Sequence, residues 1–301
     1  MHLHLDDRQR AMLLEMGVHV WLPQADTIDT IDTEVPSAPI APAHTPAARS
    51  VAPTAASADI ESLVVNAVSV RGGISRLDPA RSEVASGANA EAVEERVEGL
   101  GWAGLGLSMS TCEACRLCAG RRAPVFEAMP DETHADWLVL GDPPEDADER
   151  AGLPFADQGG QLLDNMLKAV GVRRQSATAP IPAAQAAYLT PVVKCRPALP
   201  TAPQSPDLLA CESYLKQEIA LVQPKVILAM GRFAAQTLLR ESAPQASNLP
   251  LGKLRGQIYQ YQGIPVVVSY PPSYLLRNPQ EKARAWADLC LALSVARPAQ
   301  E

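Results

Sequence analysis

Aromatic side chains are scarce in this sequence of 301 residues. They make up 4% of it, although apolar residues account for 47% and prolines number 27. This much apolar material is enough to bury a sizeable core, whereas so many prolines indicate a segment that does not pack. The composition therefore predicts a folded domain together with an unpacked region.

Long apolar runs are also missing, and none approaches the length that crosses a bilayer. The N-terminus, MHLHLDDRQR, is charged where a signal peptide would be apolar. We therefore expect a cytoplasmic protein with no membrane attachment. In that compartment the six cysteines are expected to be thiols or metal ligands rather than disulfides.

The chain has no excess of positive charge. Residues 1–107 contain 7 Lys+Arg and 15 Asp+Glu, a balance of −8, and residues 108–301 contain 19 of each. The whole net charge of −8 thus lies in the first third of the chain. Overall charge gives no support to nucleic-acid binding, although a local basic face on a neutral domain would suffice for it.

The first third of the chain divides into two segments. Residues 1–22 are predicted to hold a short helix, because residues 6–22 have an amphipathic pattern. This helix either binds a protein partner, docks on the main domain or is a frayed terminus. Residues 23–107 are expected to be a largely disordered Pro/Ala-rich linker, within which residues 89–99 have a helix-like pattern closed by a glycine.

Residues 108–296 have the alternating pattern of an α/β domain. Short apolar runs predict strands, and apolar residues at helical spacing between them predict helices. The expected strands are 136–140, 188–193, 225–230, 258–261 and 265–270, and the expected helices are 160–170, 207–221, 232–240 and 284–295. This order implies a mainly parallel sheet covered on both faces, with ligands bound at the carboxyl ends of the strands.

Four cysteines have a spacing typical of metal ligands. A C-x-x-C pair is followed much later in the chain by two single cysteines, which gives the set Cys112, Cys115, Cys195 and Cys211. Zinc and a [4Fe–4S] cluster both accept four thiolates, so spacing alone does not choose between them, and structural cysteines are the alternative. Cys118 is a substitute ligand or a neighbour, and Cys290 is expected to be a small buried side chain.

Several segments, taken together in order, resemble the family-4 uracil-DNA glycosylases. They are CEACRLC, DWLVLGDPP, GLPFADQGG, YLTPVVKCRP and LRGQIYQYQGIPVVVSYPPSYLLRNP, and the resemblance covers roughly residues 108–296. It implies a three-layer α/β/α fold with a short central sheet, and a [4Fe–4S] cluster on the same four cysteines. It also implies hydrolysis of the N-glycosidic bond of uracil flipped out of DNA, in base excision repair.

The resemblance also assigns the residues of a base pocket. The family motif G-E-A-P-G corresponds here to GDPPE, so Gly141 is kept and the catalytic carboxylate becomes Asp142, while the last glycine is Glu145. Phe155 corresponds to the phenylalanine that stacks on the base. Without its motif, Phe155 would be read equally well as a plain core residue.

Two polar groups of the family pocket are replaced by prolines. Pro191 stands in place of the asparagine that reads uracil, and Pro271 stands in place of the histidine that faces the developing negative charge. A proline side chain offers neither a donor nor an acceptor. The resemblance therefore implies a uracil-DNA glycosylase whose activity is reduced or lost. The alternative is a non-catalytic iron–sulfur module that binds DNA or a protein partner.

The resemblance further implies contact with DNA, single- or double-stranded, by a monomer. Leu275, Leu276 and Arg277 match a loop that presses on the duplex, where an apolar wedge can fill the gap left by a flipped base. Lys253, Arg255 and Arg277 are candidates for phosphate contacts. Ordinary solvated surface charge is the alternative for each of these cations.

Overall fold

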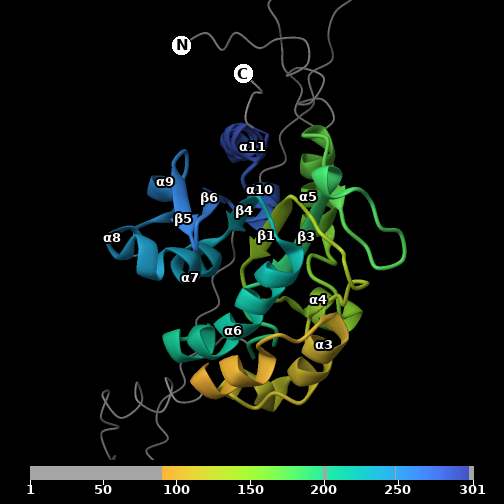
Figure 1. Cartoon of the computed structure of the whole chain (residues 1–301). Helices are drawn as coiled ribbons and strands as arrows, with labels where there is room; N and C mark the ends of the chain where they lie inside the picture. Colours follow the sequence, from red (N-terminus) through yellow and green to blue (C-terminus); the bar gives the residue numbers. More distant parts are fainter. Residues whose placement is uncertain (1–89, 199–201, 248, 298–301) are drawn as a thin grey trace, which may run out of the picture. The chain divides into compact units, whose positions relative to one another are not determined.

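The computed structural model describes residues 90–198, 202–247 and 249–297 (Figure 1). The helix expected within residues 6–22 and most of the expected linker lie outside the described residues. Among the helices that are described, none is both long and apolar enough to span a membrane.

A sheet of six strands forms the centre of the fold, in the order β2-β3-β1-β4-β6-β5. Neighbouring strands are parallel except for β5, which runs antiparallel to β6. The strands are β1 (Trp137–Gly141), β2 (Arg173–Arg174), β3 (Ala186–Pro191), β4 (Val226–Met230), β5 (Ile258–Tyr261) and β6 (Ile264–Ser269). The expected mainly parallel sheet is confirmed. β1, β3 and β4 are buried along their whole length, as continuous apolar runs predict.

Alternate residues of each strand face two separate hydrophobic clusters. Leu138 and Ile227 belong to the cluster under α3 (Trp102–Ser110), α6 (Ser205–Val222) and α7 (Arg232–Ser242). Val139 and Leu228 belong to the cluster under α5 (Gln158–Ala169) and α11 (Lys282–Ala296). Figure 1 shows α6 and α11 on opposite sides of the strands. The expected three-layer α/β/α fold is therefore confirmed.

The domain begins earlier than the expected boundary at residue 108. A helix over residues 90–97 buries Val93 and Val97, and α3 buries Trp102, all in the first cluster. The Trp102 ring stands 5.1 Å from that of Tyr188 on β3. The 90–97 helix has two apolar residues at helical spacing among many acidic ones. Its composition is therefore mostly polar, which is why the segment was assigned to the linker.

Several short elements were not predicted from the sequence. They are η1 (Arg116–Gly120), α4 (Asp146–Ala151), η2 (Ala183–Gln185), α8 (Pro244–Ser247), α9 (Leu251–Leu254), α10 (Pro272–Arg277) and η3 (Pro279–Glu281). α4 and α10 matter most for function, because they follow β1 and β6 and frame the pocket described next.

Candidate active site and metal centre

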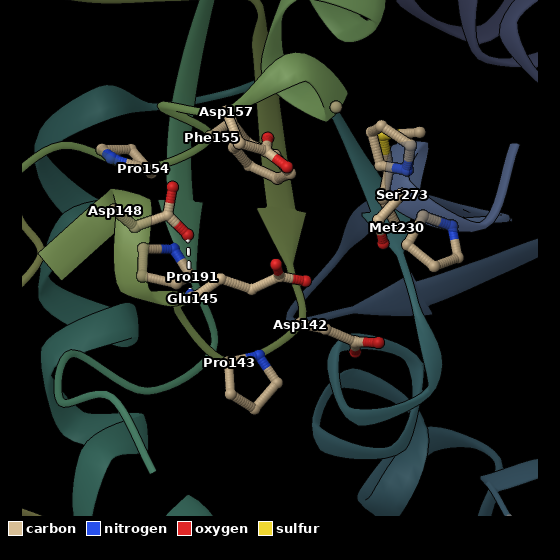
Figure 2. A pocket seen from close by; sticks show the side chains of 13 residues that line it. Asp142, Pro143, Glu145, Asp148, Pro154, Phe155, Asp157, Pro191, Met230 and Ser273 are labelled. Carbon is tan, nitrogen blue, oxygen red and sulfur yellow. Dashed lines mark hydrogen bonds between the residues drawn. The ribbon is translucent and has the colours of Figure 1, made fainter. Parts of the chain in front are cut away.

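A pocket opens where β1, β3, β4 and β6 end, and its empty volume is about 480 Å³. Figure 2 shows the side chains around it. The lining residues are Asp142, Pro143, Glu145, Asp148, Pro154, Phe155, Asp157, Gly159, Pro191, Met230, Pro271, Pro272 and Ser273. Four of the predicted site residues thus meet in one pocket, and Gly141 lies directly behind it as the last residue of β1. This is the edge of the sheet where open α/β folds bind ligands.

The position of Phe155 depends on two glycines. A Cβ atom on Gly141 would stand 2.4 Å from Cζ of the Phe155 ring, and one on Gly160 would stand 1.8 Å from the Phe155 carbonyl oxygen. Phe155 itself has a φ of 54°, a backbone conformation that residues other than glycine seldom adopt. Arg174 donates to the Pro154 and Phe155 carbonyls at 2.7 and 3.2 Å. The surroundings therefore impose a strained backbone that presents the ring to the pocket, as functional sites often do.

The Asp142 carboxylate is held by the start of α7. Its Oδ1 accepts from the backbone N–H groups of Phe233 and Ala234 at 2.8 and 3.3 Å, and its Oδ2 accepts from that of Arg232 at 3.2 Å. Burial raises the pKa of Asp142 to about 6, although these three hydrogen bonds and the Arg232 charge oppose the rise. The carboxylate proposed for catalysis thus lines the pocket while also capping a helix.

This raised pKa predicts a pH-dependent stability. The folded state holds the Asp142 proton more tightly than the unfolded chain does, with a pKa of about 6 against 3.8. Its contribution is therefore complete below pH 4 and is lost as pH rises through 6, which lowers the free energy of unfolding by about 2–3 kcal/mol. Urea denaturation of Asp142→Asn at each pH should lack this decline. Asp131→Asn, at an exposed aspartate in a surface turn, is the matched control, and parallel curves for Asp142→Asn and wild type would refute the assignment.

Both Pro191 and Pro271 line the pocket. Pro191 ends β3 and pairs in register with Gly141, and Pro271 precedes the first turn of α10. Neither side chain offers a hydrogen bond to the space they line. The Pro271 carbonyl accepts from the backbone N–H groups of Tyr274 and Leu275 at 3.0 and 3.2 Å, so it is committed to the helix.

A buried ion pair behind the pocket was not predicted. Lys194, in the VVKCRP segment, is 2% exposed, and its Nζ lies 2.7 Å from Oε2 of the fully buried Glu218. The same Nζ donates to the Pro191 carbonyl oxygen at 3.1 Å and to the Thr190 hydroxyl. Tyr188 also donates to Glu218, at 3.2 Å. Lys194 therefore holds the backbone of Pro191, a lining residue of the pocket, from the interior of the domain. The only signal of this role in the sequence was a lysine inside an apolar run.

Removal of one partner of this pair should cost much more stability than removal of both. Lys194→Met leaves the Glu218 charge buried and uncompensated, so we expect a loss of about 3–5 kcal/mol in the free energy of unfolding. Lys194→Met combined with Glu218→Leu should recover most of it. Denaturant titration of both single variants and the double variant measures the difference, and a double-variant loss equal to the sum of the two single losses would show that the pair is not coupled.

The four predicted ligand cysteines line one hollow, of about 310 Å³ of empty volume. Cys112 and Cys115 lie between α3 and η1, Cys195 follows β3, and Cys211 lies in the second turn of α6. Cys118 lines the same hollow, whereas the half-buried Cys290 packs against the second cluster, on the other face of the sheet. The fold thus brings together three segments that are well separated in the sequence.

Polar hydrogens from two neighbours point at these sulfurs. The Arg121 guanidinium donates to Cys195 Sγ at 3.4 Å and to the Cys112 carbonyl at 2.9 Å, and the Lys194 backbone N–H donates to Cys211 Sγ at 3.3 Å. Burial raises the pKa of Cys115 to about 11 and also raises that of Cys195. Buried thiols of this kind are ligands only when a metal replaces their protons.

The donor set fits an iron–sulfur cluster. No group of three or more His, Cys, Asp or Glu side chains suited to a single metal ion is found within the described ranges. In a four-iron cluster each thiolate binds a different iron, so the sulfurs surround a space instead of converging on one point. The four predicted ligands are among the five cysteines that line the hollow, and N–H donors are directed at two of their sulfurs, which matches that requirement.

The predicted DNA-contacting residues are divided between surface and interior. Leu276 is 41% exposed and Arg277 is exposed, at the end of α10. Leu275 is fully buried in the second cluster, so Leu276 is the leucine that can reach a duplex, and the prediction for Leu275 is corrected. The prediction that Arg255 contacts a phosphate is also corrected, because its Nε is bound to Asp288 at 2.7 Å and its side chain is 9% exposed.

Three further carboxylates line the pocket, and the sequence did not predict that they lie together. Glu145, Asp148 and Asp157 lie in its lining, beside Asp142. Asp148 accepts from the backbone N–H groups of Glu145 and Ala156 at 2.9 and 2.7 Å, and Asp157 caps α5 through Gly160 at 2.9 Å. In the sequence, Glu145 was noted only as the replacement for the last glycine of the family motif, and nothing indicated that these carboxylates share one pocket.

Comparison with known proteins identifies the class of enzyme that this fold and pocket define. The sequence profile of the Uracil DNA glycosylase superfamily matches residues 129–290, just over half of the chain. The type-4 uracil-DNA glycosylase of Pyrobaculum aerophilum is 30% identical over 189 residues, which cover 61% of this chain and 88% of that protein. That of Thermotoga maritima is 29% identical over 176 residues, covering 58% and 82%.

The chain belongs to the uracil-DNA glycosylase superfamily, and its resemblance to the iron–sulfur family-4 enzymes is confirmed. It is thus an N-glycosyl hydrolase by family. The alternative of a non-catalytic binding module is not favoured, because the matched relatives are named as glycosylases.

Proposed function

We propose that this protein hydrolyses the N-glycosidic bond of uracil flipped out of DNA, with a pocket that holds the base by stacking more than by hydrogen bonding. The observation that carries the proposal is the Phe155 ring. It is presented to a pocket at the carboxyl ends of the strands by a strained backbone and by the absence of side chains on Gly141 and Gly160. A flat base fits against such a ring face.

Asp142 is the residue proposed to orient the attacking water. A carboxylate has about four acceptor positions, and the start of α7 occupies three of those on Asp142. One position, on Oδ2, is therefore left for a water. The three N–H donors hold the carboxylate rigidly, so little reorganisation is needed when the water attacks C1′ of the sugar.

The pocket provides little stabilisation for the charge on the departing base. Uracil leaves with a negative charge, which a preorganised donor would stabilise. Pro191 and Pro271 provide no such donor, and the lining contains three further carboxylates. Excision of uracil is therefore expected to be slow, so it must be measured with protein in excess over DNA.

We further propose that Cys112, Cys115, Cys195 and Cys211 hold a [4Fe–4S] cluster. When bound, it supplies four iron–thiolate bonds that join the segment after α3, the turn after β3 and α6. Arg121 positions the Cys195 sulfur, and Arg196, next to Cys195, binds the buried Glu149 of α4 at 2.8 Å. The cysteine loops are thereby connected to the helix that carries one wall of the pocket.

DNA is the proposed macromolecular partner of the protein, which we expect to act as a monomer. Leu276 and Arg277 are both exposed at the end of α10, next to the pocket residues Pro271, Pro272 and Ser273. An apolar side chain there can fill the space left by a flipped base, and the guanidinium can meet a phosphate.

The proposal is tested by incubating excess full-length protein with a uracil-containing single strand and scoring alkali-labile abasic sites. We expect slow cleavage by the wild type above a buffer control, and none on the same strand with thymine in place of uracil. Phe155→Leu, which removes the ring but keeps the bulk, should reduce the rate. Cleavage no greater than buffer would overturn the proposed activity, provided that thermal melting shows the protein to be folded.

A further inference from the structure

Glu145 borders the pocket, but the proposed uracil chemistry does not use it. It is exposed and immediately precedes α4, and Figure 2 shows its carboxylate reaching into the space between Phe155 and Asp142. Partial burial of its carboxylate raises the pKa of Glu145, the charges of Asp157 and Asp148 raise it further, and that of Arg277 lowers it. Negative charge is therefore concentrated at this side of the pocket.

The remaining walls of the pocket are mainly apolar. Among the lining residues, all of which lie within the described ranges, there is no lysine, arginine or histidine. The apolar members are Pro143, Pro154, Phe155, Pro191, Met230, Pro271 and Pro272. A base in this pocket would meet proline rings, one aromatic face and carboxylates.

These surroundings affect a neutral base and a cationic base in opposite ways. A neutral base such as uracil becomes negative as its glycosidic bond breaks, and carboxylates oppose that change. A base carrying a positive charge is attracted by carboxylates and by an aromatic face before the bond breaks. It then leaves as a neutral molecule, so it requires no donor where Pro191 and Pro271 stand.

We propose that Glu145 makes this pocket accept a positively charged N-alkylated pyrimidine, of which N3-methylcytosine in single-stranded DNA is the example. This inference rests on the proposed function only in using the same pocket as the base site. The alkyl group would lie against proline instead of against a polar side chain. In duplex DNA, methylation at N3 would also remove a pairing position, so such a base is more easily extruded there than a normally paired one.

The reaction balances without any further reagent. The oxygen of a water molecule forms a bond to C1′, and the C1′–N1 bond breaks with its electron pair passing to N1. That pair cancels the positive charge of the ring, and the base departs neutral. One proton of the water is released to solvent, and the sugar keeps the hydroxyl group.

The test compares two single strands that differ in one base, N3-methylcytosine or uracil, with full-length protein in excess. Release of the free base is measured by mass spectrometry. We expect the wild type to release N3-methylcytosine and Glu145→Gln to release it at least about tenfold more slowly, because one charge at contact distance is lost. The same variant should release uracil a few-fold faster than wild type does.

Two further variants make the comparison specific. Asp146→Asn removes an equal charge from the next residue, which is outside the lining, and should change neither rate. Glu145→Asp keeps the charge and should retain more of the N3-methylcytosine rate than Glu145→Gln does. Thermal melting of each variant shows whether it is folded.

The outcomes separate this inference from the proposed function. Release of N3-methylcytosine but not uracil would overturn the proposed uracil activity and support the role of Glu145. Release of uracil alone would overturn the inference and leave the proposed function intact. An unchanged N3-methylcytosine rate in Glu145→Gln would also overturn the inference.

Discussion

Pro191→Asn combined with Pro271→His is expected to raise the single-turnover rate of uracil release by roughly 10⁴- to 10⁶-fold. Each donor to a developing anion is typically worth about 100- to 1000-fold in rate, and the two positions supply separate groups. Both prolines line the pocket, and the strand and helix around them are already in place. The variant therefore needs no new backbone, only the two polar side chains that the related family carries.

The design of this test follows from the contacts of each proline. The Pro191 carbonyl, which Lys194 binds, is unchanged by the substitution, and so is the Pro271 carbonyl at the start of α10. Each single variant should give part of the gain. Pro279→His, an exposed proline on η3 outside the pocket, is the matched control and should leave the rate unaltered. A folded double variant with the wild-type rate would show that the prolines are not what limits excision.

Cys195→Ser is expected to abolish cluster binding, with iron and acid-labile sulfide falling from four of each per chain to nearly zero. Serine is a poor ligand for iron–sulfur clusters, and with Cys118 as a neighbour and not a ligand, only three of the four proposed ligands remain. The proposed cluster would also close the long loop between Cys115 and Cys195. By analogy with a covalent cross-link across a loop of that length, its loss should lower the free energy of unfolding by about 4 kcal/mol.

Cys118→Ser is the matched control for that variant. Cys118 lines the same hollow but is not one of the four proposed ligands. Its substitution should leave the iron content, the visible absorption of the cluster and the melting temperature close to those of wild type. Full iron content in Cys195→Ser, or its loss in Cys118→Ser, would contradict the assigned ligand set.

Much of the fold was predictable because its core strands are continuous apolar runs. β1, β4 and β6 lie within a residue or two of their expected positions, and the helices between them follow their apolar periodicity. The start of the domain was not predictable, because Val93 and Val97 are two apolar residues in an acidic segment. Their burial depends on α6, which comes much later in the sequence.

The candidate site was predictable in its membership but not in its side-chain directions. The Asp142 carboxylate points to α7 because three N–H groups from a distant part of the chain meet it there. Leu275 and Leu276 are neighbours on α10, and only the packing of that helix decides which one is buried. The ion pair of Arg255 with Asp288 likewise requires that α11 return to β6.

The proposed function requires that a pocket without the two polar groups still breaks a glycosidic bond. The most direct measurement is release of free uracil from a uracil-containing single strand by excess wild-type protein, quantified against abasic sites in the same sample. We predict slow release, with one abasic site formed for each uracil and none from a thymine control. No uracil above the buffer level, from protein shown to be folded and to contain its cluster, would contradict the account.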